Sequence, residues 1–275
     1  MARLASVRGM SALVTGASSG IGRLLALRLA ADGARVAVVA RRETELRRLA
    51  AEIEAVGGEA LVLPCDVSDA EQARTAALRA EQHFGGIDLL VNNAGYGGHQ
   101  RFLDWELSDI ERMLRVNFLG AVYFTKALLP GMVLRRRGFL VFVASVAGRI
   151  ATPEESVYAA TKFALLGLAE SISVEVEEAG VHVLSVLPGV IRTPFFDGML
   201  DRLPPVARRS MVEPEGLVDA ILDALARGRR EITYPRWLAV SFLVRAIAPD
   251  FLRRQVRRTT LDALARERAA KRPPD

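Results

Sequence analysis

Residues 15–22 read Thr15-Gly16-Ala17-Ser18-Ser19-Gly20-Ile21-Gly22 and join an apolar run at 11–15 to a segment with helical periodicity at 20–32. Glycines at such a junction let the backbone turn sharply and approach a bound pyrophosphate, whose charge is met by free amides and by the helix dipole. The spacing alone also fits an ordinary tight turn, but its place between the first strand and the first helix favours a dinucleotide site. The predicted cofactor-binding residues of this loop are Gly16, Ser18, Ser19, Gly20, Ile21 and Gly22.

Outward from this loop, apolar runs alternate with helical segments. The runs at 11–15, 35–40, 60–67, 88–92, 138–144, 181–187 and 231–234 predict seven strands. Helices are expected at 20–32, 42–56, 69–84, 108–133, 155–179 and 213–227, with Ser68 and Ser108 as N-caps and Gly33, Gly57, Gly180 and Gly228 just past helix ends. Most of the runs lack polar alternation, as in a parallel sheet covered on both faces. The pattern predicts an α/β fold: a Rossmann-type, doubly wound, mainly parallel sheet of seven strands with helices on both faces.

Composition excludes several classes of protein. The chain has 275 residues, of which 51% are hydrophobic and 25% charged, as in soluble globular domains and unlike disordered chains, collagen or coiled coils. The single cysteine, Cys65, rules out a disulfide scaffold and fits a reducing cytoplasm. The three histidines are far apart along the sequence, so we expect no metal site. No run of about 18 uncharged apolar residues occurs, and we expect neither export nor a membrane span.

Charge divides the chain unevenly. Residues 227–275 hold 13 Arg and Lys against 5 Asp and Glu, whereas residues 1–226 hold 24 against 27. We expect one dinucleotide-binding catalytic domain at 1–235, with an apolar lid at about 190–212, and a basic amphipathic extension at 236–275. The run WLAVSFLVRAIA at 237–248, with arginines after it, resembles a helix at a membrane surface. A helix packed on the substrate pocket or on a second subunit is the favoured interpretation, because burial is the commoner fate of such a stripe. No nucleic-acid-binding motif occurs, and we expect no such partner.

The glycine stretch resembles that of the classical short-chain dehydrogenase/reductase family. Four further matches follow in the family's order: Asn92-Asn93-Ala94-Gly95, Asn117, Ser145 with Tyr158 and Lys162, and Pro188-Gly189. The resemblance covers roughly residues 8–235. It implies further cofactor contacts at Asp66, Val67, Asn93, Ala94, Gly95, Tyr158, Lys162, Pro188, Gly189 and Thr193, and a water held by Asn117 that connects Lys162 to solvent. Alternatives stay open: a turn cap for Asp66, a structural turn for 92–95, a helix bend for Asn117 and a loop role for Thr193.

Tyr158 and Lys162 are four residues apart in a predicted helix and therefore share one face. Hydride delivered to a carbonyl carbon builds negative charge on the oxygen, which must receive a proton. We expect the Lys162 ammonium to lower the pKa of Tyr158, which then acts as general acid and base. Ser145, at the end of the fifth strand, is expected to hydrogen-bond the same oxygen. With Asn117, these residues form the predicted catalytic set.

The choice of dinucleotide is expected to depend on the end of the second strand, where a carboxylate would bind the ribose 2′-hydroxyl of NAD. That end reads Val39-Ala40-Arg41-Arg42 and carries no carboxylate. Guanidinium groups bind phosphate in a forked geometry, so NADP(H) is favoured over NAD(H). For Arg42 the alternative is a solvated helix face shared with Arg47 and Arg48.

Together these features predict an NADP(H)-dependent oxidoreductase that interconverts a ketone and a secondary alcohol on a lipid-, steroid- or acyl-like substrate. The alternative is a protein without turnover, either an NADP-binding regulator or a membrane-surface scaffold on the same fold. The intact Ser, Tyr and Lys set favours the enzyme. We expect a small lipophilic substrate, a homo-oligomer (dimer or tetramer) and a cytoplasmic location, with peripheral contact at the inner face of a membrane left open.

Overall fold

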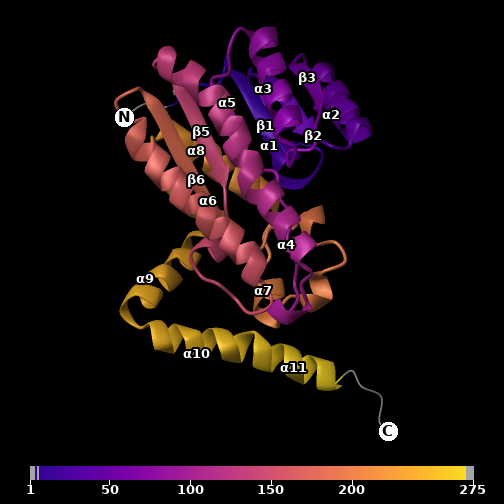
Figure 1. Cartoon of the computed structure of the whole chain (residues 1–275), viewed down its shortest axis with the longest axis vertical. Coiled ribbons are helices and arrows are strands. Elements are labelled where there is room, and N and C mark those ends of the chain that lie inside the picture. The colour runs from indigo at the N-terminus through magenta and orange to yellow at the C-terminus, as the bar shows by residue number, and fades with distance from the viewer. Residues whose placement is uncertain (1–3, 5, 271–275) are drawn as a thin grey trace.

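All seven strands belong to one parallel sheet in the part of the chain that the structure describes (Figure 1). The computed structural model describes residues 4 and 6–270, the last five as backbone only. The strands are β1 Ser11–Thr15, β2 Arg35–Ala40, β3 Glu59–Pro64, β4 Leu89–Asn92, β5 Gly138–Val143, β6 Val181–Pro188 and β7 Glu231–Tyr234. Their order is β3-β2-β1-β4-β5-β6-β7. The direction of winding reverses between β1 and β4, which confirms the predicted doubly wound fold.

Helices cover both faces of the sheet. The regular helices are α1 Gly20–Ala31, α2 Glu43–Ala55, α3 Ala70–Phe84, α4 Leu107–Leu114, α5 Gly120–Leu134, α6 Ser156–Glu175, α7 Pro205–Arg209, α8 Pro214–Ala226, α9 Val240–Ile247, α10 Pro249–Thr259 and α11 Leu261–Ala270. One hydrophobic cluster packs α1, α2 and α8 on one face, and a second packs α3, α5 and α6 on the other. Leu13 and Val14, adjacent in β1, are fully buried in opposite clusters. This two-sided burial explains the unbroken apolar strands.

Several boundaries differ from the sequence predictions. β3 ends at Pro64, not at 67: the amide of Cys65 makes the last hydrogen bond to β2, at the carbonyl oxygen of Ala40, and the chain then turns at Asp66, which binds Ser68. The N-cap of α3 is Asp69, which accepts hydrogen bonds from the amides of Glu71 and Gln72, so the prediction of Ser68 was wrong. Ser108 is also not a cap, since α4 begins at Leu107. The helix expected at 108–133 is divided into α4 and α5 by a π-helix at Arg115–Leu119.

Two helical stretches, Leu107–Leu134 and Ser156–Glu175, are long and apolar enough to cross a membrane by length and composition alone. Both pack on the sheet, α5 against β4 and β5, and α6 against β5 and β6. Helices that cover a fully buried parallel sheet need an extensive apolar face. Their composition is therefore explained by the fold.

The chain after β6 contains the segment predicted as a lid, residues 190–212, and after β7 the tail. The lid contains short helices at Pro194–Phe196 and Leu200–Arg202 followed by α7, and a bridge between Ile191 and Val212 closes its base. After β7, a 3₁₀ turn at Arg236–Ala239 leads into α9, α10 and α11, which run across one end of the molecule (Figure 1). Residues 271–275 of the predicted extension lie outside the described residues.

Candidate active site

The predicted site residues meet at the carboxyl ends of the strands, beside the reversal between β1 and β4. A groove of about 470 Å³ is lined by Arg41 and Arg42 and also by Ser145, Tyr158 and Lys162. Its wall includes Gly16, Ser19, Gly20, Ile21, Asn93, Ala94, Gly95, Pro188, Gly189 and Thr193. Ser18, Asp66 and Val67 line an adjoining cavity of about 210 Å³ that shares Arg41 with the groove. The strand ends thus bring together residues from distant parts of the sequence.

The glycine loop leaves space for a dinucleotide because its glycines carry no side chains. Gly16 has a φ of +68°, and a Cβ there would lie 2.8 Å from the Cα of Ala94. A Cβ at Gly22 would lie 2.4 Å from Nδ2 of Asn93 and 2.6 Å from the carbonyl oxygen of Gly16. Gly22 does not itself line the groove; it lets α1 approach the end of β4. Helix α1 begins at Gly20, so its first amides are available to a pyrophosphate.

Thr15 and Asn93 hold the loop in place. The Thr15 hydroxyl accepts hydrogen bonds from the amides of Asn93 and Ala94 at 3.0 and 3.1 Å. The Asn93 side chain donates to the carbonyl oxygen of Thr15 at 2.9 Å. Asn93 therefore fastens β4 to β1 through its side chain, which the sequence analysis did not foresee. Thr15 was also missed, because a threonine at a strand end carries no distinctive signal.

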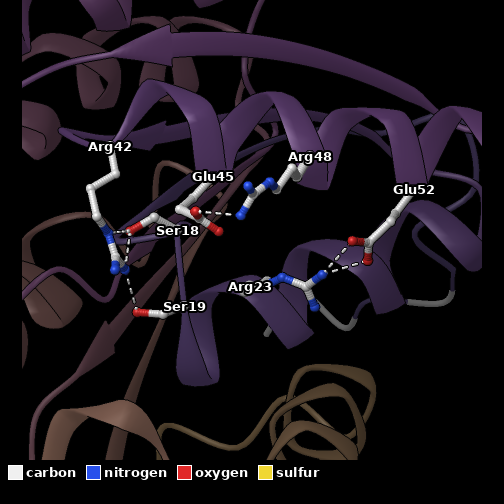
Figure 2. A network of polar contacts seen from close by, with 7 residues as sticks. All are labelled: Ser18, Ser19, Arg23, Arg42, Glu45, Arg48 and Glu52. Atoms are coloured by element: carbon white, nitrogen blue, oxygen red, sulfur yellow. Dashed lines mark hydrogen bonds and ion pairs between the residues drawn. The ribbon is translucent and has the colours of Figure 1, made fainter. Parts of the chain in front are cut away.

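Arg42 lies over the glycine loop (Figure 2). Its guanidinium donates hydrogen bonds of 2.9 Å to the hydroxyls of both Ser18 and Ser19. Arg47 and Arg48, in the same helix, instead pair with Glu43 and Glu45. Arg42 therefore does not belong to the solvated face of α2. Its guanidinium lies next to the glycine loop instead.

Asp66 has a local structural role at the edge of the adjoining cavity. Its carboxylate accepts hydrogen bonds from the amide and the hydroxyl of Ser68 at 3.0 and 2.7 Å. Burial acts to raise the pKa of Asp66, but the Ser68 hydrogen bonds and the charges of Arg41 and Arg112 outweigh it and lower that pKa. Asp66 is therefore a turn cap that also lines a cavity of the site.

Thr193 brings the loop after β6 across the glycine loop. A Cβ placed on Gly20 would lie 3.2 Å from the Cβ of Thr193. The Thr193 hydroxyl lies 3.3 Å from the carbonyl oxygen of Ile191, within its own loop. The threonine therefore borders the groove between the cradle and the catalytic side chains.

Ser145 and Tyr158, predicted to be catalytic, lie together at one corner of the groove. The Ser145 hydroxyl accepts a 3.0 Å hydrogen bond from the amide of Ala147 and faces the carbonyl oxygen of Pro188 at 3.4 Å. Burial raises the pKa of Tyr158, and a hydrogen bond with Ser145 only partly counteracts it. The phenol is consequently protonated at neutral pH, the state required of a proton donor.

Lys162 does not act on Tyr158 in the predicted way. Its ammonium lies 5.7 Å from the centre of the Tyr158 ring and donates a 2.9 Å hydrogen bond to the carbonyl oxygen of Val143. Burial lowers the pKa of Lys162 to about 8. The expectation that this cation lowers the pKa of Tyr158 was wrong for this structure, because burial dominates both groups and no charge effect of Lys162 opposes it.

Asn117 lies in the π-helix and ties it to the loop after β4. Its Nδ2 donates to the carbonyl oxygen of Tyr96 at 2.8 Å, and its Oδ1 accepts from the Tyr96 amide at 2.9 Å. A Cβ on Gly95 would lie 3.2 Å from Oδ1 of Asn117 and 3.6 Å from Nζ of Lys162. Asn117 therefore lies close to Lys162, but both polar atoms of its side chain bind the backbone of Tyr96 and hold the loop after β4 in place.

A second cavity, of about 300 Å³, meets the groove at Ser145, Tyr158, Gly189, Phe195 and Phe196. Its apolar wall includes Ala147, Ile150, Leu203, Val206, Trp237, Leu238, Val256 and Leu264. Of the apolar residues predicted in the lid segment, Phe195, Phe196 and Leu203 line this cavity, Met199 lines the groove instead, and Leu200 is 47% exposed and lines neither space. The aromatic rings of Phe195 and Tyr158 are 5.9 Å apart.

Sequence reasoning missed part of the cavity wall. His99 is buried and pairs with Glu155 at 3.2 Å, and both side chains border the cavity. The tail residues Val256, Thr260 and Leu264 also line it. No periodicity could have placed them there, because only the turns between α9 and α11 bring the tail back over the lid.

This chain is similar in sequence to known oxidoreductases. The family model described as short chain dehydrogenase matches residues 10–202. Among curated proteins, the oxidoreductase UcpA of Salmonella typhimurium is 36% identical over 224 residues, covering 81% of this chain and 82% of that protein. An uncharacterized oxidoreductase of Staphylococcus aureus is 32% identical over 216 residues, covering 78% of this chain and 90% of that protein.

Two solved structures share the fold. A short-chain type dehydrogenase/reductase from Mycobacterium marinum is 34% identical, with a TM-score of 0.76, over 84% of this chain and 95% of that chain. A short chain dehydrogenase/reductase from Burkholderia phymatum, in complex with NAD, has a TM-score of 0.82 at 24% identity, over 90% of this chain and 96% of that one. The second likeness supports the fold alone.

Proposed function

Because the chain belongs to the short-chain dehydrogenase family, we propose that it is an NADP(H)-dependent oxidoreductase that interconverts ketones and secondary alcohols on lipophilic substrates. One observation carries the proposal: the apolar cavity and the cofactor groove share Ser145 and Tyr158. A carbonyl group at this corner would have its hydrocarbon in the cavity and its oxygen at the two hydroxyls.

The chain's own residues account for the proton and the orientation of the substrate. The glycine loop, Asn93 and Thr193 would hold a nicotinamide dinucleotide in the groove, where it would supply or accept the hydride. Tyr158 donates its phenolic proton to the carbonyl oxygen during reduction and accepts it back during alcohol oxidation. Ser145 hydrogen-bonds the same oxygen and fixes its position. Lys162, held by Val143, keeps a cation beneath the tyrosine ring and toward the groove.

The preference for NADP(H) rests on the second strand. The two residues that follow β2, Arg41 and Arg42, are both basic, and neither position carries a carboxylate. Arg42 donates hydrogen bonds to the hydroxyls of both Ser18 and Ser19, next to the glycine loop. A ribose 2′-phosphate there would meet a guanidinium and two hydroxyl donors. Charge-assisted, forked hydrogen bonds of this kind are the strongest that proteins make to phosphate.

The proposed substrates are lipid-, steroid- or acyl-like, because Phe195, Phe196 and Leu203 cover the reacting corner with apolar surface. Desolvating hydrocarbon chains supplies binding energy in such a cavity. We propose further that the enzyme is a homo-oligomer, and that it is cytoplasmic and works at the inner face of a membrane. The basic tail supports the membrane contact.

A panel of ketones and secondary alcohols, assayed with NADPH, NADP, NADH and NAD, tests this function. We expect turnover of medium- and long-chain or polycyclic ketones with NADPH, and weak turnover of short polyols and sugars. Preference for sugars would contradict the lipophilic assignment. Tight NADPH binding without turnover of any member would instead favour the alternative, a nucleotide-binding regulator or membrane-surface scaffold.

A further inference from the structure

The tail helices have two faces, and the inner one belongs to the catalytic domain. Val256, Thr260 and Leu264 line the substrate cavity, and the last two are 5% and 3% exposed. α9 is equally well attached: Phe242 packs against the hydrophobic cluster, and the Arg245 guanidinium lies 5.2 Å from the centre of the Phe163 ring. The tail is thus a fixed wall of the cavity, and the exposure of its other side does not result from fraying.

The outer side of α9 is an apolar stripe. Trp237, Val240, Leu243 and Ile247 are 59%, 63%, 61% and 75% exposed. Their spacing of three and four residues places them on one side of the helical segment. Exposed apolar side chains that gather in this way mark a contact surface, whereas scattered ones do not.

The outer side of α10 continues the stripe with positive charge. Phe251, Arg254, Arg258 and Leu261 recur at helical spacing and are all exposed. Within the described residues no ion pair involves Arg253, Arg254, Arg257 or Arg258, whereas Arg47 and Arg48 on α2 are each paired with a glutamate. Segment 227–275 as a whole carries 13 basic against 5 acidic residues.

We propose that this outer face (Trp237, Val240, Leu243, Ile247, Phe251, Arg254, Arg258 and Leu261) docks the enzyme on an anionic lipid bilayer. Aromatic and aliphatic side chains flanked by arginines match the chemistry of an interfacial helix, with the apolar stripe among acyl chains and the guanidiniums at lipid phosphates. A second copy of the chain fits this face less well. A two-fold contact would bring the same surface of both copies together, and in residues 249–262 the basic residues outnumber the acidic ones, Asp250 and Asp262, by four to two, so the contact would carry a net positive charge.

The docking face and the substrate cavity lie on different sides of α10 and α11, and Trp237, in the turn before α9, borders both. If the substrate is lipophilic, as proposed above, the bilayer is the source from which the enzyme takes it. A molecule dissolved in the membrane would reach the cavity past the edge of α10 without crossing bulk water. Membrane attachment and substrate entry would then depend on one structural element.

Co-sedimentation of the full chain with vesicles tests the proposal. Vesicles of phosphatidylcholine alone are compared with vesicles that also contain phosphatidylglycerol. We expect partition onto the anionic vesicles and its loss at high salt. Arg254→Ala with Arg258→Ala should weaken this partition about 25-fold, since each basic residue near an anionic surface contributes about a factor of five. Arg47→Ala with Arg48→Ala is the matched control and should bind as the parent does.

The apolar stripe is tested separately. Leu243→Ser with Ile247→Ser should weaken partition at least tenfold, and Val56→Ser with Leu134→Ser, which changes two exposed side chains elsewhere, should not. The proposal is overturned if the parent does not bind anionic vesicles, or if neither tail variant differs from its control. Stripe variants that dissociate an oligomer without changing vesicle binding would assign the face to a second copy and also overturn it.

A parallel assay separates this inference from the proposed function. NADPH-dependent reduction of a short, water-soluble ketone is measured without vesicles. Normal turnover in a chain that does not bind vesicles contradicts only the docking proposal. Vesicle binding by a chain that reduces no ketone supports docking while contradicting the enzymatic function.

Discussion

Lys162 of α6 and Val143 of β5 are joined by a hydrogen bond of 2.9 Å from the lysine ammonium to the strand carbonyl. The bond fixes a buried cation 5.7 Å from the Tyr158 ring and fastens the catalytic helix to the end of the sheet. A charge held in such a place is costly, because burial lowers the pKa of Lys162 from 10.5 to about 8. The site therefore keeps this cation at the expense of stability.

That cost predicts a stability difference that depends on pH. Below pH 8 both the folded and the unfolded parent bind the proton, and the folded state bears the full penalty, about 3 kcal/mol. Lys162→Met removes the penalty and loses one hydrogen bond of about 1 kcal/mol. The variant should therefore be more stable than the parent by about 2 kcal/mol at pH 7.

The advantage should shrink as pH rises. Between pH 8 and 10.5 only the unfolded parent retains the proton, so the parent gains stability relative to the variant. Denaturant unfolding of both proteins across this range measures the difference. A constant difference from pH 7 to pH 10.5 would mean that the pKa of the lysine is not lowered.

The arginines after β2 should decide the choice of dinucleotide. Arg41→Ala with Arg42→Ala should weaken NADPH binding by about 2 to 4 kcal/mol, the scale of lost charged hydrogen bonds, and leave NADH binding nearly unchanged. Titration calorimetry with both dinucleotides measures this. Arg47→Ala with Arg48→Ala, on the same helix, is the control for general charge loss. Equal weakening of NADPH binding and NADH binding would mean that Arg41 and Arg42 have a structural role.

The two lid phenylalanines should determine how activity depends on chain length. Each buried methylene contributes about 0.8 kcal/mol, so kcat/KM should rise about fourfold per carbon over part of a ketone series. Phe195→Ala with Phe196→Ala should flatten this rise and spare small ketones. Leu200→Ala, at an exposed lid position outside both spaces, is the control. A flat series for the parent enzyme would remove the case for a lipophilic substrate.

The sequence was sufficient for the sheet and for most of the groove. Unbroken apolar strands can only be buried on both faces, and parallel order then collects Ser145, Pro188 and the glycine loop at one edge. The interpretation of Arg42 could not be completed from sequence. Whether it joined Arg47 on a solvated face or turned toward Ser18 depends on the helix start, which propensities locate only approximately.

Other features depend on packing that no local pattern records. The π-helix contains Asn117, whose side-chain amide makes two hydrogen bonds with the backbone of Tyr96, far from it in the sequence. The direction of the Tyr158 pKa shift depends on how deeply the phenol is buried. The tail was ambiguous for a similar reason, because its residues fit both a membrane surface and a pocket. In the structure Val256, Thr260 and Leu264 line the cavity, whereas Phe251, Arg254 and Arg258 are exposed on another side of the helices.

The measurement that tests the central claim most directly is ketone reduction by Tyr158→Phe with NADPH, alongside NADPH binding by the same protein. The account predicts that turnover falls by about 10²- to 10⁴-fold, the scale of general acid catalysis, while the dissociation constant for NADPH changes little. The substitution removes a single oxygen atom and leaves the ring in contact with Phe195. Turnover at the parent rate with normal NADPH binding would contradict the assignment of Tyr158 as the proton donor.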